Sequence, residues 1–320
     1  MTKAAELAKM GEVITNSQIG GRMNILINGD FKIWQRATSS TAANYSGPDR
    51  WYYGNAGTYS RSTDVPSGEG FQYSNNVKVT AATSYGVTAQ RIEAVNCKHL
   101  VGKTVTASFW LKTISGSTYM TCILYRANTE DGFNSGVTVI ESKTFTGVTG
   151  TWTYYTLTWS NLPSETTNGL QLYFFSADAG TDPEYRITGI QLEVGSQATP
   201  FEHRSFGEEL QLCKRYCTVI APINDEAFTF GHARTTTIAV GTVRLHPVMR
   251  TNPTITFSGV TEFQIQFANG ATQTTNMSAG ELSTEGITMQ ATIGSGLTVG
   301  QGVEIREHTT GAKITVDAEL

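Results

Sequence analysis

Short runs in which apolar and polar side chains alternate constrain this chain more than any other feature. In 103–112 (KTVTASFWLK), an apolar residue falls at every second position, starting at Val105. Because successive side chains of a β-strand point to opposite faces of the sheet, such a run predicts a strand with one buried face. The runs 151–159, 169–176 and 185–195 alternate in the same way. They predict a fold made of paired strands.

The composition agrees with an all-β fold. Only 16% of the residues are charged, 39% are hydrophobic, and 32 are glycine. Short strands separated by Gly, Ser and Asn clusters predict an antiparallel jelly-roll β-sandwich over residues 24–204. Seven further short strands predict a second, smaller C-terminal β-sandwich over residues 218–320, whose alternating Thr and Ile residues leave one face apolar. The length of 320 residues is sufficient for two such domains.

A helix is predicted between the two sandwiches, over residues 205–217. Ser205 is followed three residues later by Glu208, which is the pattern of a capping box. Glu209, Lys214 and Arg215 are expected to face away from the apolar side of this helix. That apolar side is predicted to form a seam between domains or between subunits of a trimer, and it consists of Phe206, Leu210, Cys213 and Cys217.

The N-terminal residues 1–23 also contain a short helical pattern, with Leu7, Met10 and Ile14 on one stripe. A helix this short is marginal alone, so it must pack against something. It could fold back onto its own domain. Alternatively, it is an anchor that self-associates or docks on a larger assembly.

Charge and hydropathy exclude several classes of function. The net charge is −4, the pI is about 5.8, and no basic stripe is present, so nucleic acid is not an expected partner. No run approaches the roughly 18 apolar residues of a membrane helix, so membrane insertion is not expected. The first residues resemble neither a signal peptide nor a transit peptide, which predicts synthesis in a cytoplasm.

The sequence contains no pattern typical of a catalytic or metal centre. There is no G-x-S-x-G or H-E-x-x-H motif. The four cysteines have no ligand spacing for zinc and are predicted to be buried thiols. We therefore expect neither an enzyme nor a cofactor. The five histidines are scattered singly, at His99, His203, His232, His246 and His308.

Aromatic residues on the predicted outer faces of strands are the candidate functional residues. They are Trp110, Tyr154 and Tyr173, with Trp152 and Phe175 nearby. An aromatic plane packs well against the C–H face of a sugar ring, so these residues could form a glycan site. Exposed aromatics on a sheet also mark protein interfaces. The sequence leaves both interpretations open.

Four segments together resemble tail-fibre and other virion structural proteins of marine bacteriophages, including those that infect cyanobacteria. The segments 10–36 (MGEVITNSQIGGRMNILINGDFKIWQR) and 45–53 (YSGPDRWYY) are similar to the start of these proteins. The segment 187–216 (ITGIQLEVGSQATPFEHRSFGEELQLCKRY) is similar to the end of their carbohydrate-binding-module-like jelly roll, and 246–255 (HPVMRTNPTI) to their C-terminal β-domain. These motifs span almost the whole chain.

The resemblance implies a homotrimeric, non-enzymatic virion component. Its N-terminal segment would dock on other tail or capsid proteins, and its C-terminal sandwich would form the distal tip. The resemblance also implies a structural calcium site near the first strand. Asp30 matches one part of that site, but Thr188 and Gly189 stand where an acidic residue is expected. Asp30 is therefore only a weak calcium candidate, and no metal is predicted.

The leading hypothesis is a phage tail fibre, located in the virion tail, that attaches to a host surface polysaccharide. A second hypothesis is a structural adaptor or a capsid (head) fibre decoration protein without a receptor role. A third is a depolymerase, which would have to turn over host glycan.

Overall fold

The computed structural model describes residues 23–54, 57–79, 86–176, 182–221, 226–268 and 270–320. The chain divides into two compact units, the first ending at Glu209 and the second running from Leu210 to Glu319. β-strands dominate both units, which confirms the all-β fold class. No helix among the described residues is long and apolar enough to cross a membrane. The predicted anchor residues Leu7, Met10 and Ile14 lie outside the described residues.

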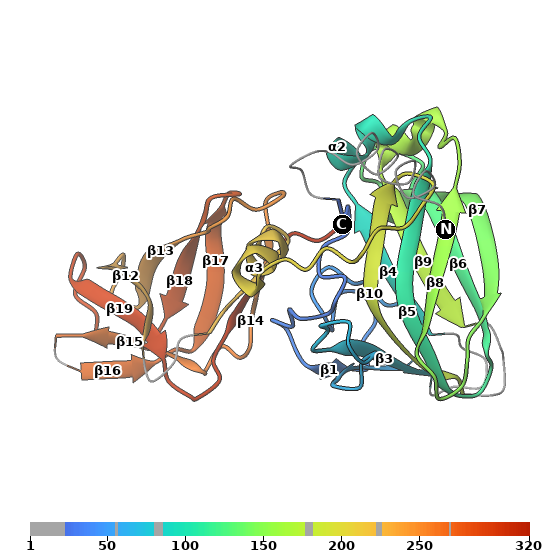
Figure 1. Ribbon diagram of the computed structural model, residues 1–320. Helices are drawn as coiled ribbons and strands as arrows, with labels where there is room; N and C mark the ends of the chain where they lie inside the picture. The colour runs from blue at the N-terminus through green and yellow to red at the C-terminus, as the bar shows by residue number, and fades with distance from the viewer. Residues whose placement is uncertain (1–22, 55–56, 80–85, 177–181, 222–225, 269) are drawn as a thin grey trace. The chain divides into compact units, whose positions relative to one another are not determined.

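The first unit is a sandwich of two antiparallel sheets (Figure 1). The six-stranded sheet has the order β1 (Ser39–Ser40), β2 (Gly57–Ser62), β3 (Ser74–Val79), β10 (Glu184–Val194), β5 (Val105–Ser115) and β8 (Thr153–Trp159). The four-stranded sheet has the order β4 (Val87–Ile92), β9 (Leu170–Ser176), β6 (Tyr119–Ala127) and β7 (Val137–Thr146). Short helical turns follow some strands: α2 (Ala94–Cys97), η1 (Lys98–Leu100), η2 (Phe133–Ser135) and η3 (Ser164–Asn168). The four runs whose alternation predicted strands are strands in the structure, and they form β5, β8, β9 and β10.

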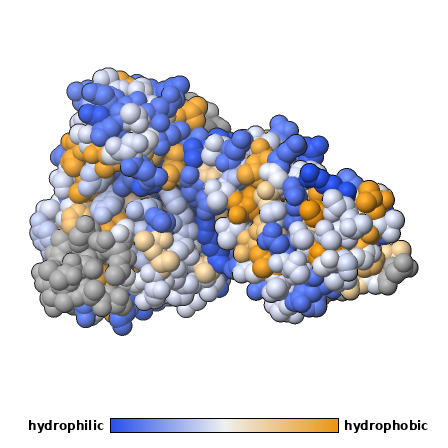
Figure 2. Space-filling model, turned by 180° about the vertical axis from the view of Figure 1, so that it is seen from behind, coloured by the Kyte–Doolittle hydropathy of each residue, from blue (hydrophilic) through white to orange (hydrophobic). Residues whose placement is uncertain are grey.

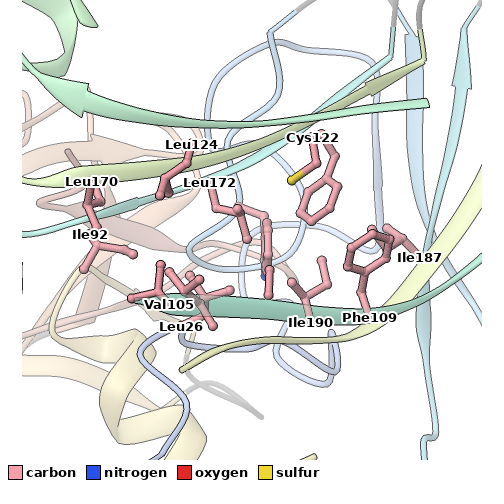
Figure 3. Close-up of a cluster of buried hydrophobic side chains, with 14 of the residues drawn as sticks. Leu26, Ile92, Val105, Phe109, Cys122, Leu124, Leu170, Leu172, Ile187 and Ile190 are labelled. Carbon is pink, nitrogen blue, oxygen red and sulfur yellow. The ribbon is translucent and has the colours of Figure 1, made fainter. Parts of the chain in front are cut away.

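The core of the first unit lies between its two sheets (Figure 3). Phe109 on β5 is fully buried and meets Phe174 on β9 edge-on, with ring centroids 4.8 Å apart. Each large apolar side chain buried in this way contributes about 1.5–3 kcal/mol. The apolar side of β5 therefore faces the core, as predicted. Its buried apolar residues are Val105, Ala107, Phe109 and Leu111.

The cysteines are buried free thiols, as the sequence analysis predicted. Burial raises the pKa of Cys97 to about 12 and also raises that of Cys122, because removal from water disfavours the thiolate. These two thiols therefore stay protonated and unreactive at neutral pH. Cys213 and Cys217 are fully buried as well.

The second unit also consists of antiparallel strands, in two sheets. One has the order β11 (Cys217–Ile220), β20 (Ile314–Asp317) and β14 (Thr254–Phe257). The other has the order β16 (Gly270–Gln273), β15 (Phe263–Phe267), β19 (Gly302–Glu307), β12 (Ala227–Ala233), β13 (Ile238–Arg244), β18 (Gly286–Thr292) and β17 (Asn276–Leu282). The seven strands predicted here are present, and β11, β16 and β17 are additional.

The apolar face of the second unit packs inside the unit itself. Ile265, Ile287, Ile305 and Ile314 come from both of its sheets and are fully buried. The alternating Thr and Ile residues of these strands had predicted an exposed apolar face. The structure corrects that expectation, because the facing sheet covers these side chains. These apolar side chains therefore do not indicate that the second unit contacts other subunits.

The connecting helix α3 is shorter than predicted and spans Phe206–Lys214. The Ser205 hydroxyl accepts a hydrogen bond from the Glu208 amide (3.2 Å), as a capping residue does. Cys217 is not helical but begins β11, because Thr, Val and Ile follow it and favour a strand. The predicted apolar side of this helix is also not buried along its whole length, since Phe206 is 60% exposed. Leu210 is half-buried and Cys213 is buried.

Glu209 faces inward, which contradicts the predicted orientation of α3. Its carboxylate accepts a hydrogen bond from the Asn28 amide (2.6 Å) and pairs with Arg204 at 3.3 Å. Burial raises the pKa of Glu209, although the Asn28 amide and Arg204 oppose this effect. Arg204 also donates to the Leu26 carbonyl (3.0 Å). A buried charge needs such partners, and the periodicity of a helix cannot reveal them.

Candidate functional site: an aromatic cleft on the six-stranded sheet

Two predicted site residues meet on the outer face of the six-stranded sheet. Trp110 on β5 lies directly opposite Tyr154 on β8. Their ring centroids are 5.3 Å apart and the planes are tilted by 51°. Tyr154 is 42% exposed, and Trp110 is half-buried. Because Phe109 and Tyr155 point inward, the strand period of two holds the Trp110–Tyr154 pair outward.

This aromatic pair lines a cleft with a volume of about 520 Å³, which is within the usual range of ligand pockets. Polar groups and further aromatic groups converge on the cleft from other parts of the unit. The residues that line it are Glu69, Ser108, Trp110, Tyr154, Gly189, Ala198, Thr199, Pro200, Phe201 and His203.

One wall of the cleft is the segment after β10, which two β10 side chains hold in place. The buried Glu193 carboxylate accepts hydrogen bonds from the Thr199 amide (2.8 Å) and the Thr199 hydroxyl (2.7 Å). The Gln191 side chain donates to the Thr199 hydroxyl (3.1 Å) and accepts from the Glu202 amide (2.9 Å). Satisfied buried polar groups of this kind fix a single loop conformation. The wall is therefore prearranged.

A break in the β10 ladder shapes the next part of the wall. Gly189 lies in an irregularity between Thr188 and Gln191, with a φ of 62°. A Cβ at Gly189 would come within 2.5 Å of the Phe71 ring, so only glycine allows Phe71 to approach the strand. The rings of Phe71, Phe201 and His203 then pack together, with centroids 4.9–5.1 Å apart.

A charged cluster borders the cleft along β5 and β10. Asp64 forms ion pairs with Lys112 and Arg186, and it accepts a hydrogen bond from the Trp152 indole nitrogen (3.0 Å). Burial alone would raise the pKa of Asp64, but the hydrogen bonds from Lys112, Trp152 and Arg186 lower it below its usual value. Lys112 also lies 5.3 Å from the centre of the Trp152 ring. Trp152 thus belongs to the border and does not line the cleft.

The other two predicted site residues, Tyr173 and Phe175, lie on β9 in the four-stranded sheet. They face outward there, where Tyr173 packs edge-on against Tyr125 with centroids 5.6 Å apart. The outer faces of the two sheets lie on opposite sides of the sandwich. The five aromatic residues therefore form two separate groups. The expectation that they lie near one another is wrong.

Asp30 is paired with a lysine. It lies 2.7 Å from the Lys32 ammonium group. Among the described residues, no group of three or more His, Cys, Asp or Glu side chains could hold a metal ion. The carboxylate of Asp30 is nearly buried, so the lysine provides its charge partner.

The cleft combines an aromatic surface with hydrogen-bonding groups around it. Ser108 and His203 can donate or accept hydrogen bonds, and Glu69 and the Thr199 hydroxyl oxygen can accept them. A ligand that fits this arrangement has an apolar face and a polar rim, as a pyranose ring does. Strand alternation predicted the outward position of Trp110 and Tyr154. It did not predict these polar residues, nor Gln191 and Glu193, which hold the wall. Most of these unpredicted residues lie in the segment 187–216. That segment resembles the end of the jelly roll of phage virion proteins, but the resemblance did not indicate what these residues do.

No protein-family model and no curated protein matches this chain. Among solved structures, it is similar to the enzymatically active domain of bacteriophage CBA120 tailspike protein 4, at 17% identity and a TM-score of 0.38. That match covers 54% of this chain and 22% of the tailspike chain. It is also similar to the CBM22-2 xylan-binding domain from Paenibacillus barcinonensis (15% identity, TM-score 0.35, covering 48% and 98% of the two chains). A third match is TmCBM61 in complex with β-1,4-galactotriose, at 15% identity and a TM-score of 0.32. It covers 55% of this chain and 100% of the TmCBM61 chain.

Proposed function

We propose that this chain is a bacteriophage tail-fibre protein that binds a host surface polysaccharide through the cleft on its first unit. The observation that carries the proposal is the Trp110–Tyr154 pair, held beside a prearranged polar wall around a volume of about 520 Å³. Each of the two rings offers a face for the C–H side of a sugar. Ser108, Thr199 and His203 line the same cleft and can bind hydroxyl groups.

The proposed role is binding without turnover. Glycoside hydrolysis usually requires two carboxyl groups that flank the scissile bond. Among the described residues that line the cleft, Glu69 is the single acidic one. We therefore expect the isolated protein to hold host polysaccharide and leave it intact. Release of oligosaccharides from the polysaccharide by the purified chain would contradict this part of the proposal.

The place in the virion rests on the sequence resemblance. Residues 1–23 would dock on other virion proteins, and the chain would assemble as a homotrimer in the tail after synthesis in the host cytoplasm. The second unit would point toward the host. Purified protein that neither binds host cells nor competes with phage adsorption would favour the alternative role of a structural adaptor or capsid decoration.

The binding test compares alanine variants of the full chain on the two faces of the sandwich. We expect Trp110→Ala and Tyr154→Ala each to raise the Kd for host surface polysaccharide about two- to tenfold, because each removes ring contact worth about 0.5–1.5 kcal/mol. Tyr173→Ala is the matched control, since it removes an outward aromatic from the other sheet. Calorimetric titration measures all three. Equal affinities for the wild type and the Trp110 variant would overturn the proposal.

A further inference from the structure

The second unit carries an exposed aromatic ring on the outer face of its seven-stranded sheet. Phe230 on β12 is 71% exposed, the largest exposure among the large apolar side chains in the described part of the chain. It lies opposite Glu304 on β19, which in turn lies opposite Gln266 on β15. These three side chains form one row across three neighbouring strands, on the outer face of the sheet. The interior side of the same strands is formed by residues such as Ile305.

This row borders a depression with a volume of about 360 Å³. Phe267 and the backbone of Gly231 and Gly302 complete much of its lining. A side chain at Gly231 is impossible, because its Cβ would lie 1.8 Å from the Val240 carbonyl oxygen. A Cβ at Gly302 would meet nothing within 4 Å, so the space beside its backbone is open.

The surroundings of Phe230 favour a small amphipathic ligand over a protein partner. Glu304 lies beside the ring and pairs with Arg306 at 3.6 Å, and Gln266 lies in the next strand. Within this row Phe230 is the apolar member, and the partly buried Phe267 adds a second ring to the lining of the depression. A stable protein interface buries about 800 Å² on each side and has an apolar centre. A pyranose needs only one ring to stack on and hydroxyl partners around it.

We propose that this depression is a second carbohydrate site, which takes one or two rings of a neutral saccharide. Phe230 packs against the C–H face of the sugar. The Gln266 amide and the Glu304 carboxylate bind its hydroxyl groups. The negative charge of Glu304 beside the ring disfavours acidic sugars. This site is separate from the cleft on the first unit, so it would add a second contact of the same chemistry to each chain.

The test uses the full chain with the first site removed by Trp110→Ala and Tyr154→Ala. Ligand-observed saturation transfer is measured with cellobiose, lactose and N,N′-diacetylchitobiose. We expect this double variant to keep a signal from at least one disaccharide. Adding Phe230→Ala should reduce that signal threefold or more, and Phe230→Trp should preserve it. Gly302→Leu should also reduce it, by filling the depression. Val248→Ala removes another exposed apolar side chain of this unit and should change nothing.

Two results would overturn this proposal. One is a double variant that gives no saccharide signal, and the other is a signal that Phe230→Ala leaves unchanged. If Phe230→Ala also changed the molar mass by light scattering, the ring would belong to an interface between copies of the chain. The single variant Phe230→Ala keeps the first site, so failure at one site is distinguishable from failure at the other.

Discussion

Glu193 shows how one buried carboxylate shapes the cleft on the six-stranded sheet. It is 4% exposed, and both of its oxygens accept hydrogen bonds from Thr199. The same strand presents Glu184 near the surface, where it lies 3.8 Å from Lys78. The two glutamates therefore differ in role although they share a strand. The first determines the shape of the cleft wall, whereas the second forms a surface ion pair of small energetic effect.

We expect Glu193→Ala to weaken both stability and glycan binding. The substitution leaves the Thr199 amide and hydroxyl without an acceptor, which costs about 1–3 kcal/mol. Glu184→Ala is the control on the same strand and should change the free energy of unfolding by less than about 1 kcal/mol. Urea unfolding and calorimetric titration measure the two effects. Wild-type affinity in the Glu193 variant would show that the wall does not contribute to binding.

Asp64 gives a prediction about pH. The lowered pKa of Asp64 means that its charged form stabilises the fold at pH values above its usual value of 3.8. That contribution is lost as the pH falls through the lowered pKa. We therefore expect Asp64→Asn to lower the Tm at pH 7 and to differ less from the wild type at pH 3. Thermal melts at both pH values test this. A Tm difference that is the same at both would contradict the role of the charge.

Among the strands, β10 determines the shape of the cleft through an irregularity in its pairing with β5. The irregularity at Gly189 lets Phe71 approach the strand, and Phe71 supports Phe201 and His203. The segment after β10 then lies over the sheet face because Gln191 and Glu193 hold it there. A strand, its bulge and the following segment thus act together to form one wall. Trp110 and Tyr154 on β5 and β8 form the aromatic surface.

We expect Gly189→Ala to disturb this wall and lower both stability and affinity. The new Cβ would displace Phe71, and its backbone would be strained at positive φ. Gly102→Ala is the matched control, since Gly102 has a φ of 69° but open space around its Cβ. The control should pay only the backbone strain of about 1–2 kcal/mol. If both variants lost equal stability and both bound glycan normally, the packing of Phe71 on Gly189 would not matter.

The sequence predicts some elements of this site and not others, for physical reasons. The period of two in a strand fixes which side Trp110 and Tyr154 face, so their outward position could be predicted. The separation of Tyr173 from them depends on strand order, which local periodicity does not contain. Glu209 was misplaced because its partner Asn28 lies 181 positions away. The roles of Gln191 and Glu193 likewise depend on tertiary hydrogen bonds.

At the scale of the whole molecule, two β-rich units occur in one chain with little net charge. Figure 2 shows that apolar residues on the face in view occur as separate patches among polar ones. Both units have cores of their own, so each is stabilised by its own packing. Each also has an aromatic ring exposed on an outer sheet face, Tyr154 in the first unit and Phe230 in the second. Several copies of such a chain would bind a polymeric ligand through many weak contacts.

We expect the whole chain to assemble as a trimer. We expect the purified full chain to have three times the mass of the 34.7 kDa monomer by light scattering. A trimer would present three copies of the cleft to one polysaccharide, which raises avidity without any new contact. A stable monomer at micromolar concentration would contradict the proposed assembly.

We expect the first unit to bind sugar on the outer face of its six-stranded sheet. A crystal structure of the full chain, soaked with an oligosaccharide released from the host surface, tests this expectation. A sugar ring should pack on Trp110 and Tyr154, with hydroxyl groups bound by Ser108, Thr199 or His203. A sugar bound instead at Tyr173 and Phe175 on the opposite sheet, with the cleft empty, would contradict it.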